Sequence, residues 1–220
     1  TLAMVNFPTD YMDSLTLPGK KLLGVYQEEN LAKVYSQRNP SRSKRRIEHQ
    51  IKTEFDQRYV NNPNIQSYIN YVLQPIDIYD ESIFMLDKLI LSPIANSGKT
   101  FYKYFVIDTV KNEYGEFLEL EFVPRNDKDL LFRGKLQVAL DGSYAVKRAE
   151  LHLGTSANIN WISSVDLELN YSPTADGVML LDNTHVGVSF GSENNQAMYA
   201  ERVSIHRDYD LDSPIVNSVF

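Results

Sequence analysis

The sequence contains no cysteine among its 220 residues. Disulfide frameworks, thiolate zinc sites and cysteine nucleophiles are therefore excluded. No apolar run is long enough to form a transmembrane helix. Basic residues are the minority, with 22 Lys+Arg against 29 Asp+Glu and a formal net charge of −7. This acidic balance argues against nucleic acid as a partner, because proteins that bind nucleic acids usually present a basic surface.

The remaining composition is that of a globular protein, with 43% hydrophobic and 23% charged residues. Linkers, internal repeats and low-complexity stretches are absent from the sequence. We therefore predict a single domain over residues 1–220, with 1–21 poorly assigned, outer strands and helices in 22–100, and an antiparallel meander in 101–210. Because the chain starts at Thr1 and stops at the apolar Val219-Phe220, we expect it to be an excised part of a longer protein.

Strand-like runs dominate the sequence after residue 100, separated by turn residues such as Asp141-Gly142. Leu120 and Phe122 alternate with Glu119 and Glu121, as in a strand that is buried on one face and solvated on the other. Asp141-Gly142 suits a two-residue hairpin turn, because both residues tolerate positive φ. The predicted strands cover residues 101–110, 115–124, 129–140, 143–154, 158–171, 177–190 and 196–209. Seven such strands predict a large antiparallel sheet that is curved by its own twist.

The first hundred residues carry mixed signals. Residues 22–35 are typical of a hairpin arm, and we favour a strand over a basic helix for 42–55. Apolar residues at helical spacing after Pro63 predict a helix that ends before Pro75. A second short helix is predicted over Glu81–Leu91, which is apolar nearly all round. The expected fold is α+β and mostly β: a curved, half-open sheet packed on one or two helices.

Catalytic and metal motifs are incomplete. Gly187-Val188-Ser189-Phe190-Gly191 fits the G-x-S-x-G pattern, but a serine elbow requires a strand, a strained turn and a helix. Here the segment runs from an expected strand into a polar turn, so a hydrolase that uses Ser189 or a histidine–carboxylate pair is the least favoured function. The four histidines lack metallopeptidase spacing, and the acidic run from Asp208 lacks the glycine and glutamate of a calcium loop. We predict no enzyme activity, no cofactor and no metal site.

A basic cluster interrupts the acidic chain at Arg42, Lys44, Arg45 and Arg46. Such a cluster can contact a phosphate-bearing headgroup or an acidic neighbouring domain. It can also be the solvated face of one strand or helix, and we favour this second interpretation.

Aromatic residues make up 11% of the chain, and many of them fall in the predicted strands. The stripe that starts at Trp161 is either part of an ordinary core or the lining of an apolar groove left open by a curved sheet. If the groove exists, we expect its ligand-binding residues to be Phe122, Phe132, Leu136, Val138, Trp161, Val165 and Leu167.

Several blocks carry a resemblance to a known family. They are Ser92-Pro93-Ile94-Ala95, Phe101-Tyr102-Lys103-Tyr104, Phe122-Val123-Pro124-Arg125, the run 129–134, the run 144–148 and the run 156–160. From about Leu22 onward the chain resembles an uncharacterised family of Bacteroidota outer-membrane proteins, labelled carboxypeptidase-like regulatory domain-containing proteins. This resemblance implies a periplasmic middle domain next to an outer-membrane β-barrel. The strand pattern is also remotely similar to the LolA/LolB lipoprotein-carrier superfamily, which implies a half-open sheet with an apolar cavity.

Two functions follow as expectations. The leading one is a non-catalytic, outer-membrane-associated periplasmic domain that binds an apolar ligand, such as a lipid or a lipoprotein acyl chain. The alternative is a structural interaction module that docks the adjoining β-barrel or a partner protein. An open apolar cavity favours the first, whereas a closed core with an exposed apolar edge strand favours the second.

Overall fold

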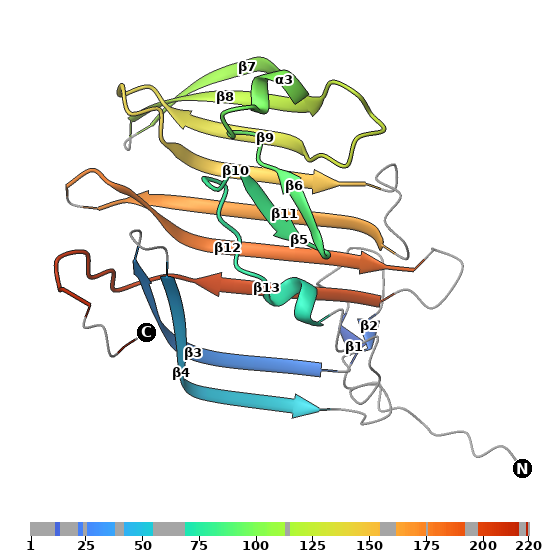
Figure 1. The fold of residues 1–220 in the computed structure, drawn as a ribbon, viewed down its shortest axis with the longest axis vertical. Coiled ribbons are helices and arrows are strands. Elements are labelled where there is room, and N and C mark those ends of the chain that lie inside the picture. Colours follow the sequence, from blue (N-terminus) through green and yellow to red (C-terminus); the bar gives the residue numbers. More distant parts are fainter. Residues whose placement is uncertain are drawn as a thin grey trace, which may run out of the picture. The chain divides into compact units, whose positions relative to one another are not determined.

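Figure 1 shows the fold of the 220-residue chain in a computed structural model. The structure describes residues 12–13, 22–23, 26–37, 42–54, 69–112, 115–154, 162–174, 176–191, 198–215 and 219. The chain divides into two compact units, one formed by Thr1–Gln66 with Asp210–Phe220 and the other by Ser67–Tyr209. The single-domain organisation stays a prediction.

The larger unit is built on a seven-stranded antiparallel sheet (Figure 1). Each strand from β8 to β13 pairs with the strand that precedes it, in the sheet order β13-β12-β11-β10-β9-β8-β7, so the predicted meander is confirmed. The strands are β7 (Tyr102–Asn112), β8 (Gly115–Pro124), β9 (Arg133–Ala139), β10 (Val146–Leu153), β11 (Ile162–Pro173), β12 (Met179–Phe190) and β13 (Met198–Ile205). The half-open, curled form expected for this sheet stays a prediction.

The β9–β10 hairpin differs from its prediction in the length of its turn. The loop spans residues 140–145 and is closed by a hydrogen bond of 2.9 Å from the Ala139 N–H to the Ala145 carbonyl. The Asp141 carboxylate accepts hydrogen bonds from the backbone N–H and the hydroxyl of Ser143, at 2.9 and 2.6 Å. This local side-chain turn extends the loop beyond two residues, because it satisfies the backbone N–H of Ser143 outside the strand ladder.

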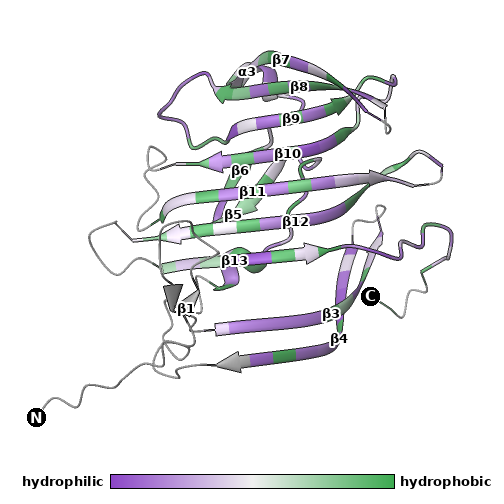
Figure 2. Cartoon of the chain, turned by 180° about the vertical axis from the view of Figure 1, so that it is seen from behind, coloured by the Kyte–Doolittle hydropathy of each residue, from purple (hydrophilic) through white to green (hydrophobic). Residues whose placement is uncertain are grey.

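One face of the sheet carries the apolar side chains and forms the core. Figure 2 shows hydrophobic and hydrophilic residues alternating along these strands. The register places Leu120, Leu136, Ala149 and Leu169 in one row across β8 to β11. Leu136, Ala149 and Leu169 are buried there, whereas their sequence neighbours on the opposite face are charged or polar. This is the pattern of an antiparallel sheet that is covered on one side only.

A β-hairpin contributes to the same core, in place of the helix predicted over Glu81–Leu91. β5 (Ser82–Met85) and β6 (Lys88–Leu91) pair with each other, and the turn residues Leu86 and Asp87 have φ of 55° and 57°. Ile83 and Met85 belong to the buried core cluster. The helix prediction is wrong because the segment is nearly continuously apolar, so it shows no period, and because its turn uses none of the usual glycine or asparagine signals.

The described helices are short. Residues 69–73 are helical, which agrees with the second half of the helix predicted after Pro63; its first half lies outside the described residues. Val72 of this turn is 5% exposed and belongs to the core cluster. α3 (Gly98–Phe101) is a single turn before β7. Neither helix is long and apolar enough to cross a membrane.

The smaller unit contains a long two-stranded ribbon. β3 (Tyr26–Gln37) pairs antiparallel with β4 (Arg42–Glu54), which confirms the strand predicted over residues 42–55. The register shifts between Leu31 and Ala32, so Glu48 lies opposite no residue of β3 in the strand register and forms a β-bulge. A second pair joins β1 (Met12–Asp13) to β2 (Leu22–Leu23).

Candidate functional site

The predicted ligand-binding residues lie in the closed core. The structure brings six of the seven together in one hydrophobic cluster, in which Phe122 and Phe132 are 0% exposed. Leu136, Val165 and Leu167 are also buried, and Val138 is half-buried against them. The seventh, Trp161, lies outside the described residues. These side chains therefore contact one another and the rest of the core.

Tyr102 shows how tightly this region is packed. Its ring meets Phe122 edge to face, with 5.6 Å between the ring centroids. Its hydroxyl donates a hydrogen bond of 2.7 Å to the carbonyl of Leu91, at the end of β6. Burial raises the pKa of Tyr102 well above its usual range, so the hydroxyl is a permanent donor here. The contact fixes the β5–β6 hairpin to the first strand of the sheet.

A shallow cleft is found away from these residues. Its volume is about 470 Å³, and its lining consists of Asn70, Tyr71, Leu73, Gln74, Pro75 and Asp87. The Tyr71 hydroxyl donates a hydrogen bond of 3.0 Å to the Asp87 carboxylate on one side of it. The mostly polar lining suits a surface depression better than a site for an acyl chain, because ligand pockets are predominantly apolar.

The strand β7 forms one edge of the sheet and presents apolar side chains to solvent. Among the strands that the structure describes, β8 is the only one that pairs with it. Phe105, Val106 and Ile107 are consecutive and are 50%, 67% and 46% exposed. A long edge strand with such side chains is an open template for another strand, and proteins usually protect it with charges, proline or bulges.

Protection of this edge is partial. The register shifts between Val106 and Asp108, so Ile107 forms a bulge, and Lys103 and Asp108 flank the apolar run. Behind the run, the Tyr104 hydroxyl donates a hydrogen bond of 2.6 Å to the carbonyl of Pro93. The strand is therefore held firmly from its inner side while its apolar side chains stay exposed. The sequence does not show that this strand is an edge, because an unbroken apolar run such as 104–107 is equally compatible with a central strand.

Charged side chains on the solvent face of the sheet pair with one another. Arg148 of β10 lies 2.8 Å from Glu150 and 3.0 Å from Glu168 on the next strand. Further along this face the His152 Nδ1 lies 2.6 Å from the Asp166 carboxylate. Because these groups pair with one another and are exposed, the face is suited to solvation.

Ser189 lies on this face as well, opposite Ser164 of β11 and Tyr199 of β13. The Nε2 of His185 on the same strand is 2.6 Å from the Glu201 carboxylate. Among the described residues, no hydrogen bond joins Ser189 to a histidine, and no group of three metal-ligating side chains is found. The prediction that the chain is not an enzyme stays a prediction.

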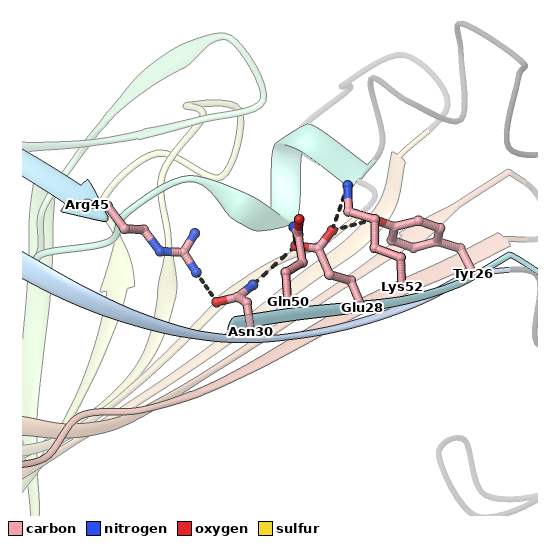
Figure 3. A network of polar contacts seen from close by, with 6 residues as sticks. All are labelled: Tyr26, Glu28, Asn30, Arg45, Gln50 and Lys52. Atoms are coloured by element: carbon pink, nitrogen blue, oxygen red, sulfur yellow. Dashed lines mark hydrogen bonds and ion pairs between the residues drawn. The ribbon is translucent and has the colours of Figure 1, made fainter. Parts of the chain in front are cut away.

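Polar side chains of the β3–β4 ribbon meet around the Glu28 carboxylate (Figure 3). The network consists of Tyr26, Glu28, Asn30, Arg45, Gln50 and Lys52. Glu28 accepts hydrogen bonds from the Tyr26 hydroxyl and, at 2.8 Å, from the Gln50 amide. Burial alone would raise the pKa of Glu28. The hydrogen bonds from Tyr26, Gln50 and Asn30, together with the Lys52 ammonium at 3.5 Å, outweigh burial and lower the pKa to about 2. The network ties the two strands together and holds Arg45 through Asn30.

Comparison with known protein families gives one match, over residues 9–206, to a family of unknown function, DUF5686. The chain belongs to the DUF5686 family. The match covers the whole seven-stranded sheet together with the ribbon. No curated protein and no solved structure matches the chain, so neither a characterised relative nor a structural neighbour assigns a role to these residues.

Proposed function

We propose that this DUF5686 domain is a non-catalytic interaction module that accepts an extended segment of a partner along the edge of β7. The observation that carries the proposal is the exposed apolar run at Phe105, Val106 and Ile107 on an edge strand. Strand addition of this kind takes its affinity from backbone hydrogen bonds and its specificity from alternate side chains.

The exposed run offers a useful amount of binding energy. Full burial of a side chain of this size contributes about 1.5–3 kcal/mol. Since the three side chains are roughly half exposed, covering them would contribute about 3 kcal/mol. Hydrogen bonds along an added strand would increase this, so a segment of several residues would suffice for specific docking.

The resemblance to Bacteroidota outer-membrane proteins supports a location and a partner. We place the domain in the periplasm, associated with the outer membrane, where the adjoining β-barrel or a partner protein would supply the added segment. The run Phe101-Tyr102-Lys103-Tyr104, which carries part of the resemblance, leads directly into the exposed part of the edge.

Transport of a lipid or a lipoprotein acyl chain has less support. The carrier-like architecture would need a half-open, curled sheet with an accessible apolar interior. Instead, neighbouring side chains pack against Phe122, Phe132 and Leu136, which are at most 2% exposed. An acyl chain would have to displace the β5–β6 hairpin to reach them.

Site-specific photocrosslinking tests the proposed function. The crosslinking amino acid p-benzoylphenylalanine replaces Val106 in the protein produced by its own cells, and Tyr144 in a matched control. Tyr144 is 69% exposed, against 67% for Val106, but lies in the β9–β10 loop. We expect a discrete adduct at position 106 whose linked peptide maps to the barrel or to one partner protein. Equal adducts at both positions, or none at 106, would contradict the proposal.

Native mass spectrometry of the same preparation distinguishes the alternative. After solvent extraction, a stoichiometric acyl lipid would support the carrier function, whereas a clean apo mass together with the adduct supports docking.

A further inference from the structure

The end of the β3–β4 ribbon concentrates positive charge in an acidic chain. Residues 33–46 contain six of the 22 Lys+Arg and none of the 29 Asp+Glu. The chain as a whole has a net charge of −7, so this segment is opposite in sign to the rest. Ionised side chains gathered in this way raise the local concentration of anionic partners.

The strand register separates these cations from a set of apolar side chains. Because side chains alternate along a strand, one face of the ribbon end carries Lys33, Tyr35, Arg42, Lys44 and Arg46. The other face carries Ala32, Val34, Ser36, Ser43, Arg45 and Ile47. Val34 and Ile47 are 59% and 47% exposed. The ribbon end is therefore amphipathic, with a cationic face and a small apolar face.

Two local contacts sharpen this division. On the apolar face, the Arg45 guanidinium donates a hydrogen bond to the Asn30 side chain, which directs its charge toward the Glu28 network (Figure 3). On the cationic face, Glu48 lies 3.3 Å from Lys33 and 3.7 Å from Arg46. Since one carboxylate faces several cations, the face keeps a net positive charge.

We propose that the end of the β3–β4 ribbon binds the surface of a bilayer that contains anionic phospholipids. Its cations would contact the phosphate groups, while Val34 and Ile47 would enter the boundary between headgroups and acyl chains. Surface-lying amphipathic elements combine the same two features, and each Lys or Arg near an anionic surface adds to the attraction. A free phosphate polymer would use the cations alone, whereas a bilayer surface also uses the exposed apolar face.

Vesicle cosedimentation of this chain tests the proposal. The vesicles contain 30% phosphatidylglycerol in phosphatidylcholine, or phosphatidylcholine alone. Replacing Lys44 and Arg46 by serine should weaken binding to the anionic vesicles by about 25-fold, since each cation contributes about fivefold. Replacing Val34 and Ile47 by serine should weaken it by about tenfold, because less apolar surface is buried. A higher salt concentration should weaken binding mainly by screening the attraction between the cations and the anionic vesicles.

The matched control removes two cations elsewhere. Lys88 and Lys128 are exposed and lie outside the ribbon, so replacing both by serine changes the net charge equally. We expect this control to bind like the wild type, and circular dichroism to show that all variants keep their sheet signal. Equal loss in the control, equal binding to neutral vesicles, or binding to polyphosphate without binding to vesicles would overturn the proposal. An unchanged affinity of the Val34/Ile47 variant would overturn the insertion of the apolar face.

Discussion

Gly134 of β9 lies directly against the backbone of β10, and we expect its replacement by alanine to be strongly destabilising. A Cβ atom added there would lie 1.8 Å from the carbonyl oxygen of Glu150 and 3.3 Å from the Cα of Leu151. Both atoms belong to the backbone of β10, so rotation of a side chain cannot relieve the clash. Moving the strands apart would weaken the buried hydrogen bonds between them. Each buried polar group that loses its partner costs about 1–3 kcal/mol. We expect a loss of about 3 kcal/mol in the free energy of unfolding, which lowers the Tm by about 6–12 °C for a chain of this size.

Gly142 provides the matched control in the same hairpin. Its φ is 93°, and an added Cβ meets nothing within 4 Å. Gly142→Ala should therefore cost only about 1–2 kcal/mol, from backbone strain alone. Thermal and urea unfolding, followed by circular dichroism, measure both variants. If Gly134→Ala were no more destabilising than Gly142→Ala, the close approach of β9 and β10 would be refuted.

Two further variants test the edge and the ribbon. Val106→Lys should change the free energy of unfolding by less than about 0.5 kcal/mol, because the side chain is 67% exposed. With p-benzoylphenylalanine placed at position 105 instead of 106, the same substitution should abolish the crosslink; a persisting crosslink would exclude docking at this edge. Glu28→Gln should remove the pH dependence of the stability of the β3–β4 ribbon. The pKa of Glu28 is lowered from 4.5 to about 2, so its contribution to ribbon stability is complete above pH 4.5 and is lost as the pH falls through 2. Hydrogen exchange of the β3 and β4 amides, corrected for intrinsic rates, should show this loss in the wild type only; equal profiles would contradict the role assigned to Glu28.

The sheet could be predicted because its strands are solvated on one face. Glu119 and Glu121 alternate with apolar residues, and this period of two appears only where one side of a strand meets water. The β5–β6 hairpin lacks such a signal, since Ile83, Met85 and Ile90 are buried while the exposed neighbours Phe84 and Leu89 are apolar as well. Its polar residues, Ser82, Asp87 and Lys88, lie at the start of β5, in the turn and at the start of β6, so none of them alternates with the buried residues to mark the outer side.

The candidate sites were harder to predict than the fold. The stripe of Trp161, Val165 and Leu167 favours a core but also fits an open groove, because composition does not show what covers a sheet face. The edge at β7 follows from the strand order, which depends on pairing across the whole sheet. An apolar run such as 104–107 is typical of a central strand, yet here it lies at the margin.

The meander order has a consequence for how the sheet assembles. After β7, every strand of the sheet pairs with the one made immediately before it, so each new hairpin closes only a short loop and needs no long-range search. Assembly can then proceed in the direction of synthesis, starting with β7 and β8 and ending with β13. We expect the β7 edge to be formed early, before the later strands are in place, so that docking at this edge can begin while the remainder of the sheet is still folding.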